Sequence, residues 1–127
     1  MSIQPAVQVG ALPGTHRVIL PFPPSANNYW RHNRGRTHRT HEADAYKKHV
    51  GLLCMAFDVR PLDGLLCVSF TFYRPAKRGD LDNMLKVTID SLIGWAYQDD
   101  KQIVELHAKR YEDKGDPRVE IVITETA

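Results

Sequence analysis

The chain has 127 residues, 43% of them hydrophobic, and a formal net charge of +2 at pH 7. This length and composition fit one folded domain with a modest core and exclude a disordered tail. The small net charge does not by itself require a nucleic-acid partner, so the distribution of the charges carries more information than their sum.

Features of a secreted or membrane protein are absent from the sequence. No apolar run approaches the roughly 20 residues that span a bilayer, and the segment from Met1 to Gly14 lacks the basic start and apolar core of a secretion signal. Cys54 and Cys67 lie in separate apolar runs without a CxxC partner. We therefore expect reduced thiols and a cytoplasmic protein with no membrane contact.

The first predicted elements are a strand, a long polar loop and a helix. Residues 1–15 are expected to form a flexible extension before a short strand at 18–20, which prolines end. The loop that follows reaches about Thr40 and has no expected regular structure, a length usually found in functional or disordered loops. Apolar residues at spacings of three and four then predict a helix over 42–58 with Thr40 as its N-cap.

The second half of the chain is predicted to form three strands and one helix. Alternating apolar residues indicate a strand at 65–73, and the helical period returns over 82–93 with Gly94 at the helix end. Two further strands are expected near 102–111 and 118–124, paired as an antiparallel hairpin. The order β-α-β-α-β-β predicts an α+β fold, with residues 16–127 as one domain and a mixed sheet packed against two helices.

The charges separate into two blocks. Residues 31–49 contain six basic residues against two acidic ones, whereas residues 80–100 contain five aspartates against one lysine. Arginines on a loop can neutralise DNA phosphates, and nearby Tyr29 and Trp30 could stack on unpaired bases. A solvated polar loop without a ligand is the alternative. Aspartates that converge need a cation among them, and all-oxygen ligands favour Mg²⁺ or Mn²⁺.

Each acidic residue also has an ordinary structural interpretation. Asp80 and Asp82 straddle the predicted start of a helix, where they could turn toward one metal ion or could simply cap the helix. Lys86 and Asp90 follow Asp82 at intervals of four, which suits either a lysine beside a metal site or a salt-bridged helix surface. Neighbouring residues on a strand point to opposite faces, so at most one of Asp99 and Asp100 should join a metal site while the other caps the turn.

Three motifs in order resemble the RusA family of Holliday junction resolvases, over about residues 17–125. The first motif reads Leu20-Pro21-Phe22-Pro23-Pro24-Ser25-Ala26-Asn27, followed by Tyr29-Trp30-Arg31-His32-Asn33-Arg34-Gly35-Arg36-Thr37-His38. The second reads Arg78-Gly79-Asp80-Leu81-Asp82-Asn83, followed by Lys86 and Asp90, and the third reads Asp99-Asp100-Lys101-Gln102.

The resemblance implies a homodimeric, Mg²⁺-dependent endonuclease that resolves four-way DNA junctions. The oxygen ligands also suit Mn²⁺ as a substitute metal. The resemblance implies metal-binding and catalytic roles for Asp80, Asp82 and Asp100 and a catalytic role for Lys86, and it leaves Asn83, Asp90 and Asp99 as secondary candidates. The expected DNA-binding residues are Asn27, Tyr29, Arg31, Arg34, Arg36 and Arg39. The alternatives are a nuclease with broader specificity for branched DNA or flaps and a junction-binding protein without catalytic activity.

Overall fold

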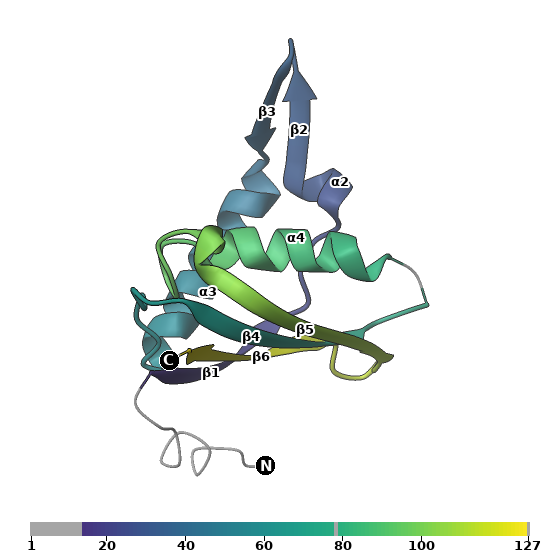
Figure 1. Cartoon of the computed structure of the whole chain (residues 1–127). Helices are drawn as coiled ribbons and strands as arrows, with labels where there is room; N and C mark the ends of the chain where they lie inside the picture. Colours follow the sequence, from purple (N-terminus) through teal and green to yellow (C-terminus); the bar gives the residue numbers. More distant parts are fainter. Residues whose placement is uncertain (1–13, 78, 127) are drawn as a thin grey trace.

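The computed structural model describes residues 14–77 and 79–126 of the chain, and its centre is a four-stranded mixed sheet (Figure 1). The sheet contains β1 (Thr15–Pro21), β4 (Leu66–Arg74), β5 (Ile103–Glu112) and β6 (Arg118–Glu125). Helix α4 (Leu81–Leu92) lies over one face of this sheet, and α3 (His41–Ala56) packs against α4 and β1. The α+β class, the mixed sheet and the two long helices are therefore confirmed. Most of the expected N-terminal extension falls outside the described residues, and Thr15 already belongs to β1.

The strand order is β1-β6-β4-β5, so the expected hairpin of the last two strands is wrong. Strand β4 lies between them and pairs parallel with β5 and antiparallel with β6. The reason is burial: β4 alternates buried and half-buried residues along its whole length, whereas nearly every residue of β5 is exposed. The most apolar strand takes the centre of the sheet, and β5 becomes an edge.

The polar segment before α3 is folded, which corrects the prediction of a structureless loop. A short helix α2 (Ala26–Tyr29) leads into a hairpin of β2 (Trp30–Asn33) and β3 (Arg36–Arg39) that projects away from the sheet (Figure 1). Both turn residues have positive φ, 52° at Arg34 and 76° at Gly35, as a two-residue turn with the twist of a hairpin requires. The sequence did not predict this hairpin because both strands are polar, whereas alternation of apolar residues is the usual sign of a strand.

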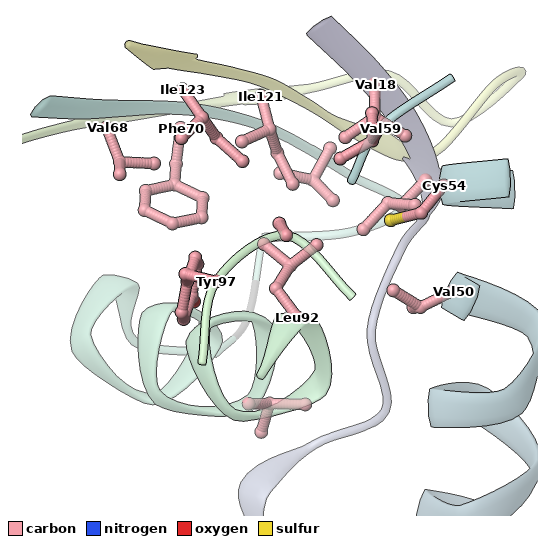
Figure 2. Packing of buried hydrophobic residues seen from close by; sticks show 14 of the residues in the cluster. Val18, Val50, Cys54, Val59, Val68, Phe70, Leu92, Tyr97, Ile121 and Ile123 are labelled. Atoms are coloured by element: carbon pink, nitrogen blue, oxygen red, sulfur yellow. The ribbon is translucent and has the colours of Figure 1, made fainter. Parts of the chain in front are cut away.

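The core lies between the sheet and the two helices. Figure 2 shows Phe70 and Ile121 of the sheet facing Leu92 and Tyr97, with Cys54 of α3 at one side. Thr40 caps α3 by accepting a hydrogen bond from the Ala43 amide at 3.0 Å, as predicted. Gly94 follows α4 at a φ of 90° and ends it, also as predicted.

Two further predictions concern thiols and membranes. Cys54 and Cys67 are both free, which confirms the expected reduced cysteines. Among residues 14–77 and 79–126, no helix has the length and apolar character needed to cross a bilayer.

Candidate active site and DNA-binding hairpin

The β2–β3 hairpin carries four of the six expected DNA-binding residues. Its arginines are all exposed, and the pairing of the two strands places Arg31 and Arg36 on one face, Arg39 on the other and Arg34 in the turn. The Arg31 guanidinium donates to the backbone oxygen of Asn27 at 3.4 Å, which links the hairpin to α2. A narrow, cationic projection of this kind can contact phosphates without reading base sequence.

Tyr29, in contrast, is a buried anchor, which corrects its expected role in stacking on DNA bases. Its ring is fully buried and contacts Trp30 edge to face at a centroid distance of 4.6 Å. Its hydroxyl donates to Oδ2 of Asp90 at 2.6 Å, and Arg39 lies 3.5 Å from the same oxygen. Burial and this hydrogen bond raise the pKa of Tyr29, so the phenol stays protonated. The base of the hairpin is thus fastened to α4.

Lys47 of α3 adds a further contact to the region where the hairpin, α3 and α4 meet. Its ammonium donates to the backbone oxygens of Asp90 at 2.9 Å and Ile93 at 2.7 Å, which are carbonyls at the C-terminal end of α4. The Asp90 oxygen also accepts from the Ile93 amide at 3.2 Å, and the helix dipole favours a cation at this end of α4. Burial lowers the pKa of Lys47, although the charge of Asp90 acts in the opposite direction.

The first two predicted catalytic aspartates lie at the N-terminal end of α4. Asp80 occupies the N-cap position, yet its side chain makes no capping hydrogen bond, so capping does not explain its carboxylate. Asp82 lies in the first turn with Asn83, and Lys86 follows one turn later; all three are exposed. Arg74 holds the preceding segment in place by donating to the Gly79 oxygen at 3.1 Å while it pairs with Glu112 at 2.9 Å.

The second acidic pair lies before β5, in the 3-10 helix η1 (Asp100–Gln102), and its two members differ. Asp99 caps η1 by accepting from the Lys101 amide at 2.9 Å, and the side chain of Gln102 completes a capping box. That amide hydrogen bond lowers the pKa of Asp99. Burial, followed by a side-chain hydrogen bond with Asp99 and by the charges of Asp99 and Asp90, raises the pKa of Asp100. The capping role therefore falls to Asp99, and Asp100 remains the member available for a ligand.

The expected convergence of Asp80, Asp82 and Asp100 does not occur within one chain. Asp80 and Asp82 lie at the N-terminal end of α4, and η1 lies near its C-terminal end (Figure 1). A helix of 12 residues is about 18 Å long at its rise of roughly 1.5 Å per residue. Asp90, near the C-terminal end of α4, is close enough for its charge to raise the pKa of Asp100. One chain thus holds two separate acidic groups.

Cys67, Glu105 and His107 form a cluster that the sequence did not indicate. Their ligand atoms lie within 4.8 Å of one another, and within residues 14–77 and 79–126 no other group of three or more His, Cys, Asp or Glu meets that criterion. Cys67 and Glu105 are register partners on β4 and β5, which no local motif could show. Glu105 pairs with His107 at 2.7 Å. The register places this cluster on the sheet face opposite α4 and the aspartates.

Comparison with known proteins identifies the family. Residues 21–124 match the family model described as Endodeoxyribonuclease RusA. The chain belongs to the RusA family. It is 35% identical over 115 residues to a crossover junction endodeoxyribonuclease from Enterobacteria phage 82, and 33% identical over 121 residues to proteins of the same name from Escherichia coli K12 and O1:K1. Each alignment covers 87% of this chain and 95% of the relative.

The RusA match includes every residue singled out as a candidate. The hairpin, both acidic groups and strands β4, β5 and β6 lie wholly or largely inside residues 21–124, whereas β1 falls mostly outside them. The resemblance inferred from the three motifs is confirmed at the level of the family. Two features of this RusA chain came from tertiary structure alone, namely the anchoring of the hairpin through Tyr29 and the separation of the acidic groups.

Proposed function

We propose that this chain is a Mg²⁺-dependent endodeoxyribonuclease that resolves four-way DNA junctions by paired, symmetric nicks during recombination and repair. The observation that carries the proposal is the match to RusA endodeoxyribonucleases over nearly the whole chain. The arginine hairpin and the exposed aspartates of α4 add a physical reason, because the hairpin can hold DNA phosphates while the aspartates hold a metal. Such an enzyme acts on cellular DNA, and we place it in the cytoplasm.

Asp80 and Asp82 are the side chains best suited to hold the ion. Mg²⁺ is commonly bound by one or two carboxylates together with phosphate oxygens and water, and these two exposed carboxylates fit that donor set. Mn²⁺ accepts the same oxygen ligands and should substitute. When bound, the ion would lower the pKa of a water molecule and neutralise charge at the scissile phosphate. Asp100 fits the set by chemistry but not by its position within one chain.

The remaining residues would position the DNA and stabilise charge. Lys86 lies one helical turn beyond Asp82, so its ammonium can reach the same phosphate and stabilise the negative charge that develops there. Arg31, Arg34 and Arg36 would bind backbone phosphates of the junction arms. Asn83 is exposed in the first turn of α4 and could donate a hydrogen bond to DNA, whereas Asp90 and Asp99 serve in anchoring and capping.

We further propose that the active form is a homodimer. A four-way junction has near two-fold symmetry, and a dimer with two-fold symmetry presents two equivalent sites to it. Two sites acting together would nick opposite strands in pairs.

A nicking assay on a synthetic mobile four-way junction tests the function. With Mg²⁺ we expect paired nicks, and with EDTA none. Asp82→Asn should bind the junction and lose cleavage by about 10²–10³-fold, the usual loss when one group that stabilises the transition state is removed. Asp63→Asn is the matched control, because Asp63 is exposed in the α3–β4 connection, and it should cleave normally.

The substrate panel separates the alternatives. Equal cleavage of flaps and junctions would indicate a broader branched-DNA nuclease. Tight junction binding that EDTA does not affect, with no nicks in Mg²⁺ or Mn²⁺, would indicate a binding protein and refute the enzymatic proposal.

A further inference from the structure

The face of the sheet opposite α4 carries a group of side chains that the nuclease chemistry does not use. Cys67 of β4 and Glu105 and His107 of β5 bring a thiol, a carboxylate and an imidazole within 4.8 Å of one another. We propose that these three residues bind one Zn²⁺ ion, and that the ion fastens the edge strand β5 to the central strand β4. The proposal does not depend on the proposed function, because α4, whose N-terminal end carries Asp80 and Asp82, lies over the other face of the sheet (Figure 1).

A register shift between β4 and β5 creates the cluster. Leu66 pairs with Ile103, but the next residue of β4, Cys67, pairs with Glu105, so β5 contains one extra residue at this point. Side chains of a strand alternate between the two faces of a sheet, and without the shift Glu105 and His107 would point toward α4. Bulges are rare between parallel strands, and they are over-represented at sheet edges and beside active sites, where they re-aim side chains. This bulge turns both ligands toward the thiol.

The chemistry of the three side chains suits Zn²⁺, which proteins bind through thiolate, imidazole and carboxylate groups. The negative charges of the Cys67 thiolate and of Glu105 balance the two positive charges of the ion, and neutral His107 adds none. Burial and the charge of Glu105 raise the pKa of the Cys67 thiol, so the thiol is protonated before the ion binds, and its proton passes to the solvent when the Zn–S bond forms. Mg²⁺ prefers oxygen ligands, so this site selects a different ion from Asp80 and Asp82.

The ligand atoms need little adjustment to hold the ion. Nε2 of His107 lies 2.7 Å from Oε2 of Glu105, and the Cys67 sulfur lies within 4.8 Å of the ligand atom of each. A tetrahedral zinc ion with bonds of about 2.0–2.3 Å places its ligand atoms roughly 3.3–3.8 Å apart. The Glu105 and His107 side chains are more than half exposed, so both can turn to this separation without disturbing the core. Zn²⁺ takes Nε2 in place of the hydrogen bond, the imidazole then carries its proton on Nδ1, and a water molecule fills the fourth position.

Titration with Zn²⁺ against a competing chromophoric chelator tests the site. Metal-free protein with Asp80→Asn and Asp82→Asn is used, so that the carboxylates at α4 do not contribute to the count. We expect one equivalent of Zn²⁺ per chain, which excess Mg²⁺ does not displace. Cys67→Ser and His107→Gln should each weaken binding by more than about 100-fold, the upper end of the loss caused by removing a group that only orients a ligand. The matched control is His49→Gln, at an exposed position of α3, which should leave zinc binding unchanged.

Cobalt and thermal unfolding supply two further readouts. Co²⁺ can replace Zn²⁺ in tetrahedral sites, and a thiolate bound to it produces an ultraviolet charge-transfer band. We expect this band with the wild-type chain and its loss in Cys67→Ser, which retains the buried Cys54. Because Zn²⁺ would tie β5 to β4 only in the folded state, the unfolding temperature should rise by roughly 5–10 °C at a free Zn²⁺ concentration of about 100 times the dissociation constant. Glu105→Gln should reduce this rise.

Three results would overturn the inference. Zinc binding that Cys67→Ser and His107→Gln leave unchanged would place the ion elsewhere on the chain. A bound cobalt ion without the charge-transfer band would exclude the sulfur as a ligand. A wild-type chain that binds no Zn²⁺ would leave the cluster as a hydrogen bond between His107 and Glu105 beside a free thiol. Circular dichroism checks the folding of each variant, and the exposed His107→Gln carries the test if Cys67→Ser does not fold.

Discussion

Removing the hydroxyl of Tyr29 should loosen the hairpin from the sheet domain. Tyr29→Phe keeps the buried ring and its contact with Trp30, and it deletes only the hydrogen bond to Oδ2 of Asp90 at 2.6 Å. A hydrogen bond to a charged group contributes about 1.5–3 kcal/mol. The Asp90 side chain is 25% exposed, so water can replace part of the lost interaction, and we expect a loss of about 1–2 kcal/mol.

Urea unfolding followed by circular dichroism measures this change. For a domain of this size, 1 kcal/mol corresponds to a shift of the unfolding temperature by roughly 4 °C, so a shift of roughly 4–8 °C should accompany it. Asp90→Asn and the double variant complete a cycle, in which we expect a coupling energy of about 1 kcal/mol. The matched control is Tyr111→Phe, because Tyr111 is half-exposed on β5.

Two results would refute this reasoning. An unchanged midpoint for Tyr29→Phe would show that the hydroxyl is not an anchor. Strict additivity with Asp90→Asn would show that the two residues act independently. A loss of junction binding in Tyr29→Phe without any loss of stability would instead return Tyr29 to a direct role at the DNA.

Two further predictions concern the arginine hairpin and the packing of α3. Replacing Arg31 and Arg36 with alanine should weaken binding to junctions of any sequence. It should also make the negative slope of log K against log salt shallower by about 2, because each phosphate contact contributes roughly 0.9. An unchanged slope would mean that these side chains do not touch phosphate. Gly51→Ala should destabilise the protein by about 1–3 kcal/mol in urea unfolding, since the added Cβ would lie 2.4 Å from the Trp95 ring. Equal or greater stability of the Gly51→Ala variant would contradict that packing. The control is Ala45→Gly on the exposed side of α3, which measures the effect of helix propensity alone.

Much of the fold could be predicted because local periodicity survives in the tertiary structure. The stripe from Ala43 to Cys54 predicted α3, and the alternation along Leu66 to Phe72 predicted β4, each within two residues of the observed bounds. Gly94 and Thr40 marked helix ends by their backbone and capping preferences. These signals depend on neighbours a few residues apart, which a sequence displays directly.

The strand order was not available from the same signals. The short connection between β5 and β6 suggested a hairpin, but adjacency in the sheet is decided by which strand most needs burial on both sides. The β2–β3 hairpin was missed for a related reason, because its two faces are polar and solvent-exposed. Its turn depends on backbone angles at Arg34 and Gly35 that composition only weakly indicates.

The sequence by itself determined the chemistry of this protein: its family, its acidic residues and its arginines. Only the tertiary structure decided which of these residues meet. It made Tyr29 an anchor for Asp90, gave the capping role to Asp99 rather than Asp100, and placed Asp80 and Asp82 at the far end of α4 from Asp100. The physical reason is that motifs and spacing fix residue types and local geometry, whereas distances between elements follow from how the whole core packs.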